Sequence, residues 1–210
     1  MLAWHFLPED KRLGYGDGRL VEVGQTLECE GEPALCSNGM HGSVRLIDAL
    51  KYASGPIVCR VEIEGDVIES EDKLCGRRRT VLWMLDATQI LHEFACQCAE
   101  DAMTLVERPD ERSVAAIEAK RAWLDGKITD EELDAAWAAA WDAALDAASW
   151  AAARDAAAWA VAWAAARNAA WAARSAAWNA SRSAAQDDAR AKQNERLTAM
   201  VMDAHEKEGE

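Results

Sequence analysis

The stretch that decides the fold is residues 135–180, AAWAAAWDAALDAASWAAARDAAAWAVAWAAARNAAWAARSAAWNA. Alanine fills over half of these positions, and neither glycine nor proline occurs between Lys127 and Glu208. Alanine has the best intrinsic helix propensity, whereas glycine and proline interrupt helices. The pattern predicts a long Ala/Trp-rich helical region over residues 129–206, and an unbroken rod over residues 130–204 would be roughly 110 Å long.

One break point leaves two alternatives for this region. Asn179, Ser181 and Ser183 are poor residues for a helix interior, because their side chains compete for backbone hydrogen bonds. Ser183 and Gln186 also have the spacing of a capping box, which begins a new helix. The region is therefore either a coiled-coil-like rod or a helical hairpin that folds back near Ser183.

The tryptophans of this region follow an 11-residue repeat. The pair Trp137 and Trp141 recurs 22 residues later, and an 11-residue period keeps such residues on one face of a helix. Burial of six tryptophans would contribute roughly 20–35 kcal/mol before the cost of ordering them, so we expect this face to be covered. It either packs against the rest of the chain or forms a homo-oligomer. The predicted interaction residues are Trp137, Trp141, Leu145, Trp159, Trp163, Trp171, Trp178, Arg167 and Arg174.

Residues 1–105 have a different pattern, which predicts a small N-terminal mixed α/β domain and an α+β fold class for the chain. Residues 19–30 alternate apolar and polar side chains on both sides of Gly24, which indicates strands. Residues 56–70 indicate two strands joined in a tight hairpin at Gly65 and Asp66. Residues 80–85, TVLWML, form a short apolar run that is typical of a central strand.

Helices are predicted on both sides of the linker that covers residues 106–128. Residues 88–103 have helical apolar spacing, and a second short helix is expected from Ser113 to Asp125. Gly126 has the position of a glycine that ends a helix. Thr129 with Glu132 has the spacing of a capping box, which places the beginning of the Ala/Trp-rich region there.

Composition excludes several classes of function. The chain carries 37 acidic against 23 basic residues, which disfavours nucleic acid as a partner and favours a basic protein surface. The longest apolar run is about half the ~20 residues that a transmembrane helix needs, so we expect no membrane association. The first residues lack the pattern of a secretory signal, and we expect the six cysteines to be free thiols. These features predict a cytoplasmic protein.

The segment LCSNGMHGS, residues 35–43, contains the candidate catalytic residues Cys36, His41 and Ser43. A thiol beside an imidazole is a conceivable nucleophile and base. The alternative is a structural turn in which Gly39 has positive φ and Ser43 caps the helix that follows. Zinc sets can be drawn from cysteines and histidines, but they lack two close ligand pairs, so we predict no metal and no cofactor. Those sets are Cys29, Cys36, His41 and Cys59, and His92, Cys96 and Cys98.

Residues 3–87 resemble an uncharacterised domain of tailed-phage and prophage proteins. The resemblance rests on VGQT at residues 23–26, the loop from Cys36 to His41, and the strand at residues 57–64. Residues 122–130, AWLDGKITD, are similar to the joint that precedes Ala/Trp/Arg repeat helices in such proteins. Some of those proteins carry the label of immunity proteins. The resemblance implies a phage or prophage origin and supplies no catalytic residues.

Two functions follow as expectations. The first is a non-enzymatic phage or prophage accessory protein that acts by protein–protein contact and oligomerises through the Ala/Trp helix. Its partner would be a virion protein, or a host defence protein that it inhibits. The second is a nucleotide-transfer enzyme, implied by a fainter resemblance to ADP-ribosyltransferase-like folds in the His41 and Ser43 loop, the following helix and a long strand.

Overall fold

The computed structural model describes residues 1–14, 16–146 and 184–209, and the chain forms two compact units. The first unit comprises Met1–Ala87 together with Asn194–Glu210, and the second comprises Thr88–Gln193. All described strands lie in the first unit, which confirms the α+β class. Helix α2 (Thr88–Met103) has the predicted bounds, but it belongs to the second unit rather than to the strand-containing one.

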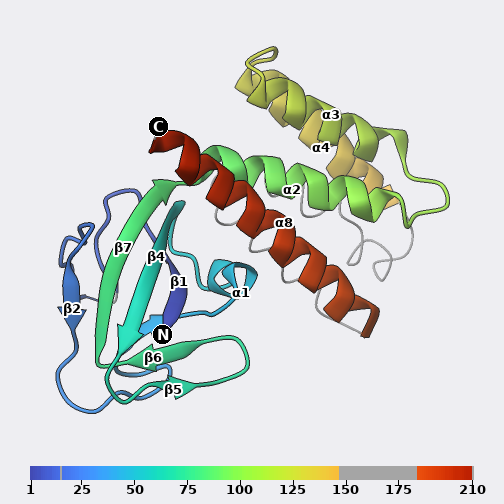
Figure 1. The fold of residues 1–210 in the computed structure, drawn as a ribbon. Coiled ribbons are helices and arrows are strands. Elements are labelled where there is room, and N and C mark those ends of the chain that lie inside the picture. The colour runs from blue at the N-terminus through green and yellow to red at the C-terminus, as the bar shows by residue number, and fades with distance from the viewer. Residues whose placement is uncertain (15, 147–183, 210) are drawn as a thin grey trace. The chain divides into compact units, whose positions relative to one another are not determined.

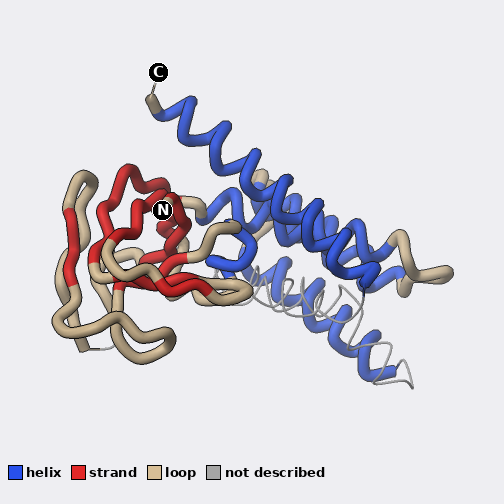
Figure 2. Tube along the Cα trace, turned by 60° about the horizontal axis from the view of Figure 1, so that its bottom comes forward, coloured by secondary structure: helices blue, strands red, loops and turns tan. Residues whose placement is uncertain are grey.

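Four antiparallel strands form the main sheet of the first unit, in the order β1-β4-β7-β2 (Figure 1). Their bounds are Leu2–Leu7 for β1, Thr26–Glu28 for β2, Ile57–Glu64 for β4 and Arg78–Asp86 for β7. The prediction of a central strand at residues 80–85 is confirmed, because β7 lies between two neighbours. Figure 2 shows the strands of this unit gathered together.

A second sheet continues from the free edge of β1. It has the order β3-β6-β5, with bounds Met40–Gly42, Leu74–Gly76 and Ile68–Glu69. Trp4 and Ser43 link the two sheets, since each backbone N–H donates to the other's carbonyl, at 2.7 and 2.9 Å. The apolar core of the unit lies on one face of the main sheet. It consists of Ala3, Leu7, Val21, Leu27, Met40, Ile57, Cys59, Val61, Ile63, Leu74 and Val81.

The opposite face of the main sheet carries the alternate residues of the strands, and the C-terminal helix packs there. Helix α8 (Ala184–Glu208) places Asn194, Leu197, Val201 and His205 on one side, because they are spaced three or four residues apart. The Asn194 side-chain oxygen accepts from the Ile47 backbone N–H at 3.1 Å, at the beginning of α1 (Leu46–Leu50). These contacts make the end of the chain part of the N-terminal unit.

The C-terminal end of this side of α8 also contacts the first unit. The imidazole of His205 stacks on the indole of Trp83 in β7, with ring centroids 4.0 Å apart and planes 13° apart. Leu197 and Val201 lie between the two anchors and are fully buried. The sequence pattern predicted a helix here, but it did not predict this attachment.

The predicted hairpin at Gly65 and Asp66 is wrong. Both residues have positive φ, 73° and 50°, so the chain does turn there. However, β5 pairs with β6, whereas β4 pairs along its full length with β7, and Arg77 N–H donates to the Gly65 carbonyl at 2.8 Å. Strand β4 pairs with β7 rather than with β5, because β7 supplies more backbone pairs and more buried side chains. The two residues of β5, Ile68 and Glu69, are exposed.

Two further predictions for the first unit need correction. Residues 19–30 form only one short strand, β2, because Gly24 turns with φ of 81° and Leu20 pairs with Arg12 in an isolated bridge. Ser43 does not cap a helix. Helix α1 begins after Arg45 without a side-chain cap, because Ser43 is already paired with β1.

The second unit contains α2, α3, α4 and the first residues of α8, and sequence signals mark the ends of α3 and the beginning of α4. Helix α3 (Glu111–Leu124) is capped by Asp110, whose carboxylate accepts from Arg112 N–H at 2.9 Å, so its beginning lies before the predicted Ser113. Gly126 has φ of 68°, as a C-terminal glycine requires. The capping box of α4 (Asp130–Asp146) is confirmed: Thr129 N–H donates to the Glu132 carboxylate at 2.8 Å, and Glu132 N–H donates to the Thr129 hydroxyl at 3.3 Å.

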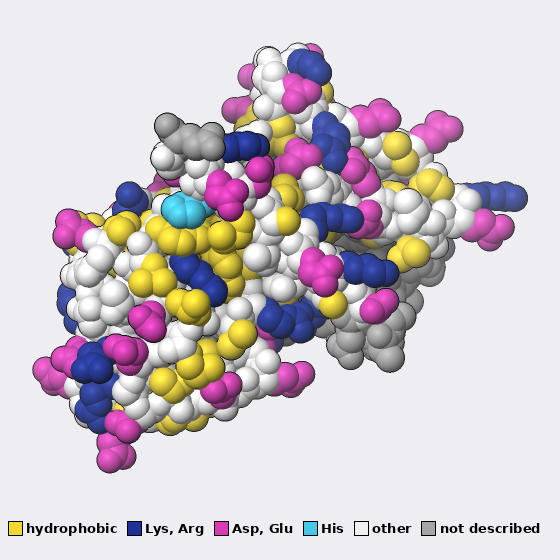
Figure 3. Space-filling view, viewed as in Figure 1, with side chains coloured by type: hydrophobic (Ala, Val, Ile, Leu, Met, Phe, Trp, Pro, Cys, Tyr) yellow, Lys and Arg dark blue, Asp and Glu magenta, His cyan; other side chains and the backbone are white. Residues whose placement is uncertain are grey.

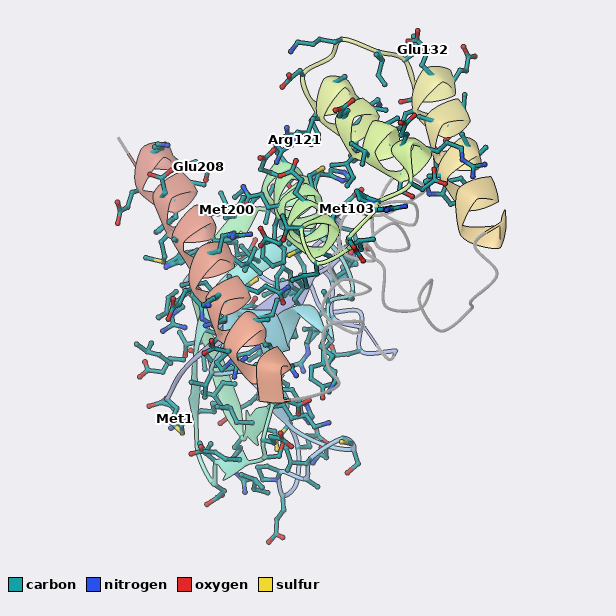
Figure 4. The ribbon with its side chains drawn as sticks, turned by 90° about the vertical axis from the view of Figure 1, so that its right-hand side faces the viewer. Met1, Met103, Arg121, Glu132, Met200 and Glu208 are labelled. Carbon is teal, nitrogen blue, oxygen red and sulfur yellow. The ribbon has the colours of Figure 1, made fainter. Side chains whose placement is uncertain are left out.

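An arginine joins α2 to α3. The Arg121 guanidinium donates to Glu93 at 2.7 Å and binds the Glu100 carboxylate in a two-pronged contact. Figure 4 labels Arg121 among the side chains of the second unit. These ion pairs raise the pKa of Arg121, with the hydrogen bonds to Glu100 as the largest cause. They fix the register of the two helices, because a guanidinium fork fits a carboxylate in one geometry.

The predicted Ala/Trp-rich region is helical at its two described ends, α4 and α8. Residues 147–183, and with them the predicted break near Ser183, lie outside the described residues. None of the described helices is long and apolar enough to cross a membrane.

Candidate functional site

The structure brings together two of the three predicted catalytic candidates. Cys36 is exposed, with φ of 67°, and its backbone N–H donates to Nε2 of His41 at 3.3 Å. Burial lowers the pKa of His41, as do the charges of Arg79 and Lys73, and a neutral imidazole is the form that can accept this bond. This hydrogen bond therefore holds the segment 34–38 against β3, the strand that contains His41.

The residue that sequence reasoning missed is Lys73. Its ammonium nitrogen donates to the Cys36 sulfur at 2.8 Å and lies 4.9 Å from the centroid of the Tyr52 ring. The hydrogen bond to Cys36 raises the pKa of Lys73, so the amine carries its charge at neutral pH. No sequence signal joins residues that are 37 positions apart.

A carboxylate holds the neighbouring side chains in place. Asp72 accepts from the Tyr52 hydroxyl at 2.7 Å and from the Lys51 ammonium at 2.5 Å. The second contact raises the pKa of Lys51. The cluster of Cys36, Lys51, Tyr52, Asp72 and Lys73, here called the thiol–lysine cluster, thus joins α1 to the turn before β6 on the surface of the first unit.

Ser43 takes no part in this cluster. Its side chain is 1% exposed, and its backbone is bound to Trp4. A substrate bound at Cys36 would therefore not reach the Ser43 hydroxyl. The structure does not assemble the three candidates Cys36, His41 and Ser43 into one accessible set.

A second group of contacting side chains lies on the face of the main sheet opposite the apolar core, the face on which α8 packs. Trp4, Arg60 and Trp83 face one another across β1, β4 and β7. The Arg60 guanidinium lies 4.5 Å from the Trp4 ring centroid, and the Trp4 and Trp83 rings meet edge to face at 5.6 Å. His205 continues this row by stacking on Trp83. We call these four residues the aromatic row.

Exposed apolar side chains flank the aromatic row. Leu2 is 51% exposed, and Leu82, which occupies the bulge between the paired residues of β7, is 39% exposed. Figure 3 shows hydrophobic side chains gathered around basic ones on this face of the molecule. A shallow pocket lies beyond the row at the end of β7. It is lined by Glu9, Lys11, Ile57, Met84, Leu85, Asp86 and Glu208.

The second unit contains a buried polar cluster between α2 and α3. Lys120 is 1% exposed, and its ammonium lies 3.7 Å from the Trp123 ring centroid, while His92 meets the same ring edge to face at 5.5 Å. Burial lowers the pKa of Lys120 to about 8 and that of His92 to about 4. The Trp123 indole N–H donates to Asp130 at 2.6 Å, which ties the cluster to α4.

The predicted interaction residues are described only at their beginning. Trp137 lies in α4 and is partly buried. The other members lie outside the residues whose side chains the structure describes. Their role as a contact face stays a prediction.

The cysteines and histidines of the two zinc sets drawn from the sequence lie among the described residues. All six cysteines are free thiols. Within residues 1–14, 16–146 and 184–209, no group of three or more His, Cys, Asp or Glu side chains is arranged to hold a metal ion.

Comparison with known proteins gives a family match, and it covers the N-terminal part of the chain. Residues 3–93 match the family model described as "Domain of unknown function (DUF7666)". The match begins in β1 and ends within α2, so it includes the thiol–lysine cluster and most of the aromatic row. No curated protein and no solved structure matches the chain.

Proposed function

We propose that this protein acts by protein–protein contact, with the aromatic row as its binding surface and the Ala/Trp-rich region as a long helix that makes it a homo-oligomer. The observation that carries the proposal is the pair of partly exposed side chains Arg60 and Trp83 beside the exposed Leu2 and Leu82, with the buried ring of Trp4 beneath them. Tryptophan and arginine contribute most to binding energy at protein interfaces. The rings are held by one another before any partner arrives, so little side-chain entropy is lost on binding.

The resemblance of residues 3–87 to phage and prophage proteins supports a phage or prophage origin for this protein. In this proposal the protein is a phage accessory protein in the host cytoplasm or in a virion. The partner is a virion component or a host defence protein with a basic surface, because the chain has a formal net charge of −14. The enzymatic alternative is disfavoured by the burial of Ser43, which no nucleotide could reach.

The surface is tested by site-specific crosslinking. A photoreactive amino acid in place of Leu82, beside the aromatic row, should give one dominant adduct of defined mass when the protein is irradiated in its host cell. The same replacement at Leu105, which is 86% exposed in the second unit, is the control. Identical adduct patterns at both positions, or none at Leu82, would contradict the proposal.

Self-association is tested in the full-length chain. A truncation before the Ala/Trp-rich region would also remove α8, whose residues from Asn194 onward belong to the first unit. Replacing Trp159 and Trp163 with glutamine keeps helix propensity but removes apolar surface from the predicted seam. The double variant should have a lower native mass, whereas Trp150→Gln, on the opposite side of the predicted helix, should not. A monomeric wild-type protein would refute self-association.

A further inference from the structure

The thiol–lysine cluster holds a thiol and an amine in contact, and the proposed binding surface uses neither group. All six cysteines lie among the described residues, and Cys36 alone of them is exposed, so a small reagent in solution can reach its sulfur. The Lys73 nitrogen lies 2.8 Å from that sulfur. This separation is shorter than the roughly 3–3.5 Å from which two well-placed atoms can form a bond. The pair therefore meets the distance requirement for a covalent link between the two side chains.

The loop around Cys36 fixes the sulfur without help from the lysine. Ala34 and Asn38 exchange two backbone hydrogen bonds, at 2.7 and 3.0 Å. The Asn38 side-chain amide also donates to the carbonyls of Glu30 and Glu32, at 2.7 and 2.9 Å. Cys36 has φ of 67°, a left-handed conformation that persists in a residue other than glycine only when its surroundings hold it. These bonds determine where the thiol points.

The segment that carries Lys73 is held just as firmly. The Ser70 backbone N–H and hydroxyl both donate to the Lys73 carbonyl, at 2.8 and 3.1 Å. Its ammonium lies 4.9 Å from the ring centroid of Tyr52, whose hydroxyl donates to Asp72 at 2.7 Å. The contact between amine and thiol is thus not a chance meeting of two free side chains. Groups that are already positioned react far faster than the same groups in free solution.

We propose that Cys36 and Lys73 form a reversible sulfur–nitrogen bond, a sulfenamide, when a peroxide oxidises the Cys36 thiol. In the first step the sulfur attacks a peroxide oxygen and the O–O bond breaks. The sulfur loses two electrons to become a sulfenic acid, and hydrogen peroxide is reduced to water. In the second step the Lys73 amine, having released its extra proton to solvent, attacks the sulfur. The S–O bond breaks, and the departing hydroxide takes a proton from the nitrogen as a second water.

The sulfenamide has two consequences for the first unit. It protects the Cys36 sulfur from further, irreversible oxidation. It also ties the loop of residues 34–38 covalently to the residue that precedes β6. Two molecules of a small thiol reverse the bond: they restore the Cys36 thiol and the Lys73 amine, and they leave as their disulfide. The proposal is independent of the proposed binding surface, because none of the aromatic row takes part.

Peptide mapping of the full-length protein tests the proposal. The protein is treated with hydrogen peroxide, its remaining thiols are blocked with iodoacetamide, and it is digested with trypsin without reductant. Trypsin does not cut after a modified lysine, so residues 61–77 should stay whole and linked to residues 20–45. The linked pair should be about 2 Da lighter than its two parts, and a small thiol should separate them.

Three results of this mapping would overturn the proposal. The first is the absence of any link. The second is a link from residues 20–45 to residues 74–77 with the chain cut after Lys73, because that product is a disulfide to Cys75. The third is a linked pair that carries one additional oxygen atom, because the nitrogen and sulfur would then be joined through oxygen rather than directly.

The two lysines of the cluster provide matched variants. Lys73→Arg keeps a positive charge beside the sulfur, but a guanidinium stays protonated and has no free amine to attack. This variant should form no link, and dimedone, which traps sulfenic acids, should label Cys36 after peroxide treatment. Lys51→Met should link as the wild type does, because Lys51 donates to Asp72 rather than to the sulfur. Equal linkage in the wild type and in Lys73→Arg would contradict the assignment of the nitrogen to Lys73.

Discussion

Leu197→Ala should destabilise the N-terminal unit, although the residue is more than 100 positions away from the strands in sequence. Leu197 is 0% exposed and lies between the two contacts that hold α8, Asn194 with Ile47 and His205 with Trp83. A buried Leu→Ala change costs about 2–5 kcal/mol, and more where the surroundings cannot collapse into the cavity. Because both flanking contacts hold the helix in place, we expect about 3 kcal/mol.

Hydrogen exchange measured by mass spectrometry is the suitable assay, because unfolding of a chain with two units is not a single transition. Peptides from β4 and β7 should exchange roughly 100-fold faster in the variant, since each 1.4 kcal/mol is about a tenfold change. Glu195→Ala, an exposed position on the same helix, is the control. If Leu197→Ala and Glu195→Ala leave β4 and β7 equally protected, α8 is not part of the core of this unit.

Three further predictions concern local contacts. Iodoacetamide should label Cys36 before the four buried cysteines, because the Cys36 thiol is exposed, as peptide mapping would show. The His92 pKa is about 4 in the folded chain and about 6.5 when unfolded, so the unfolded state binds more protons between these values and stability falls as the pH is lowered. The second unit should lose about 2 kcal/mol between pH 7 and 5, and His92→Leu should remove most of this dependence in pH-dependent hydrogen exchange. Thr129→Ala should cost about 1 kcal/mol of stability in the same unit, measured by the same method, and an unchanged value would show that the capping box contributes nothing.

The parts of the fold that sequence predicted are those governed by neighbours along the chain. The capping box of Thr129 and Glu132 formed as expected, and so did the glycine turn at Gly126. Both depend on backbone groups within four residues, so their geometry is set locally. Helix α2 was predicted with its observed bounds because a sustained apolar period is also a local signal.

Pairing between strands was predicted less well. The turn at Gly65 and Asp66 exists, but whether β5 or β7 pairs with β4 depends on which strand offers more partners over its whole length. The same applies to Ser43, which has the right residue type for a helix cap. A backbone partner on β1 competes for it, and only the folded chain brings Trp4 to that position.

The candidate site likewise combines residues that the sequence marked with residues that only the folded chain brings to them. Cys36 and His41 are five positions apart in one loop, and the sequence already marked them. Lys73 and Arg79 come from segments more than 30 residues further along the chain. Lys73 precedes β6, which pairs with β3, and it donates to Cys36, whereas Arg79 donates to the His41 carbonyl from β7. Single-sequence patterns carry no information about which lysine will meet which thiol.

The sequence by itself predicted that the two described ends of the Ala/Trp-rich region, α4 and α8, are helical, because segments without glycine or proline lack the residues that interrupt a helix. It also determined an α+β N-terminal part, whose alternating apolar positions require a sheet. Only the tertiary structure decided that α8 from Asn194 onward belongs to the N-terminal unit and that Trp83 stacks on His205. The physical reason is that helix propensity is a property of local backbone, whereas burial depends on which apolar faces are complementary across the whole chain.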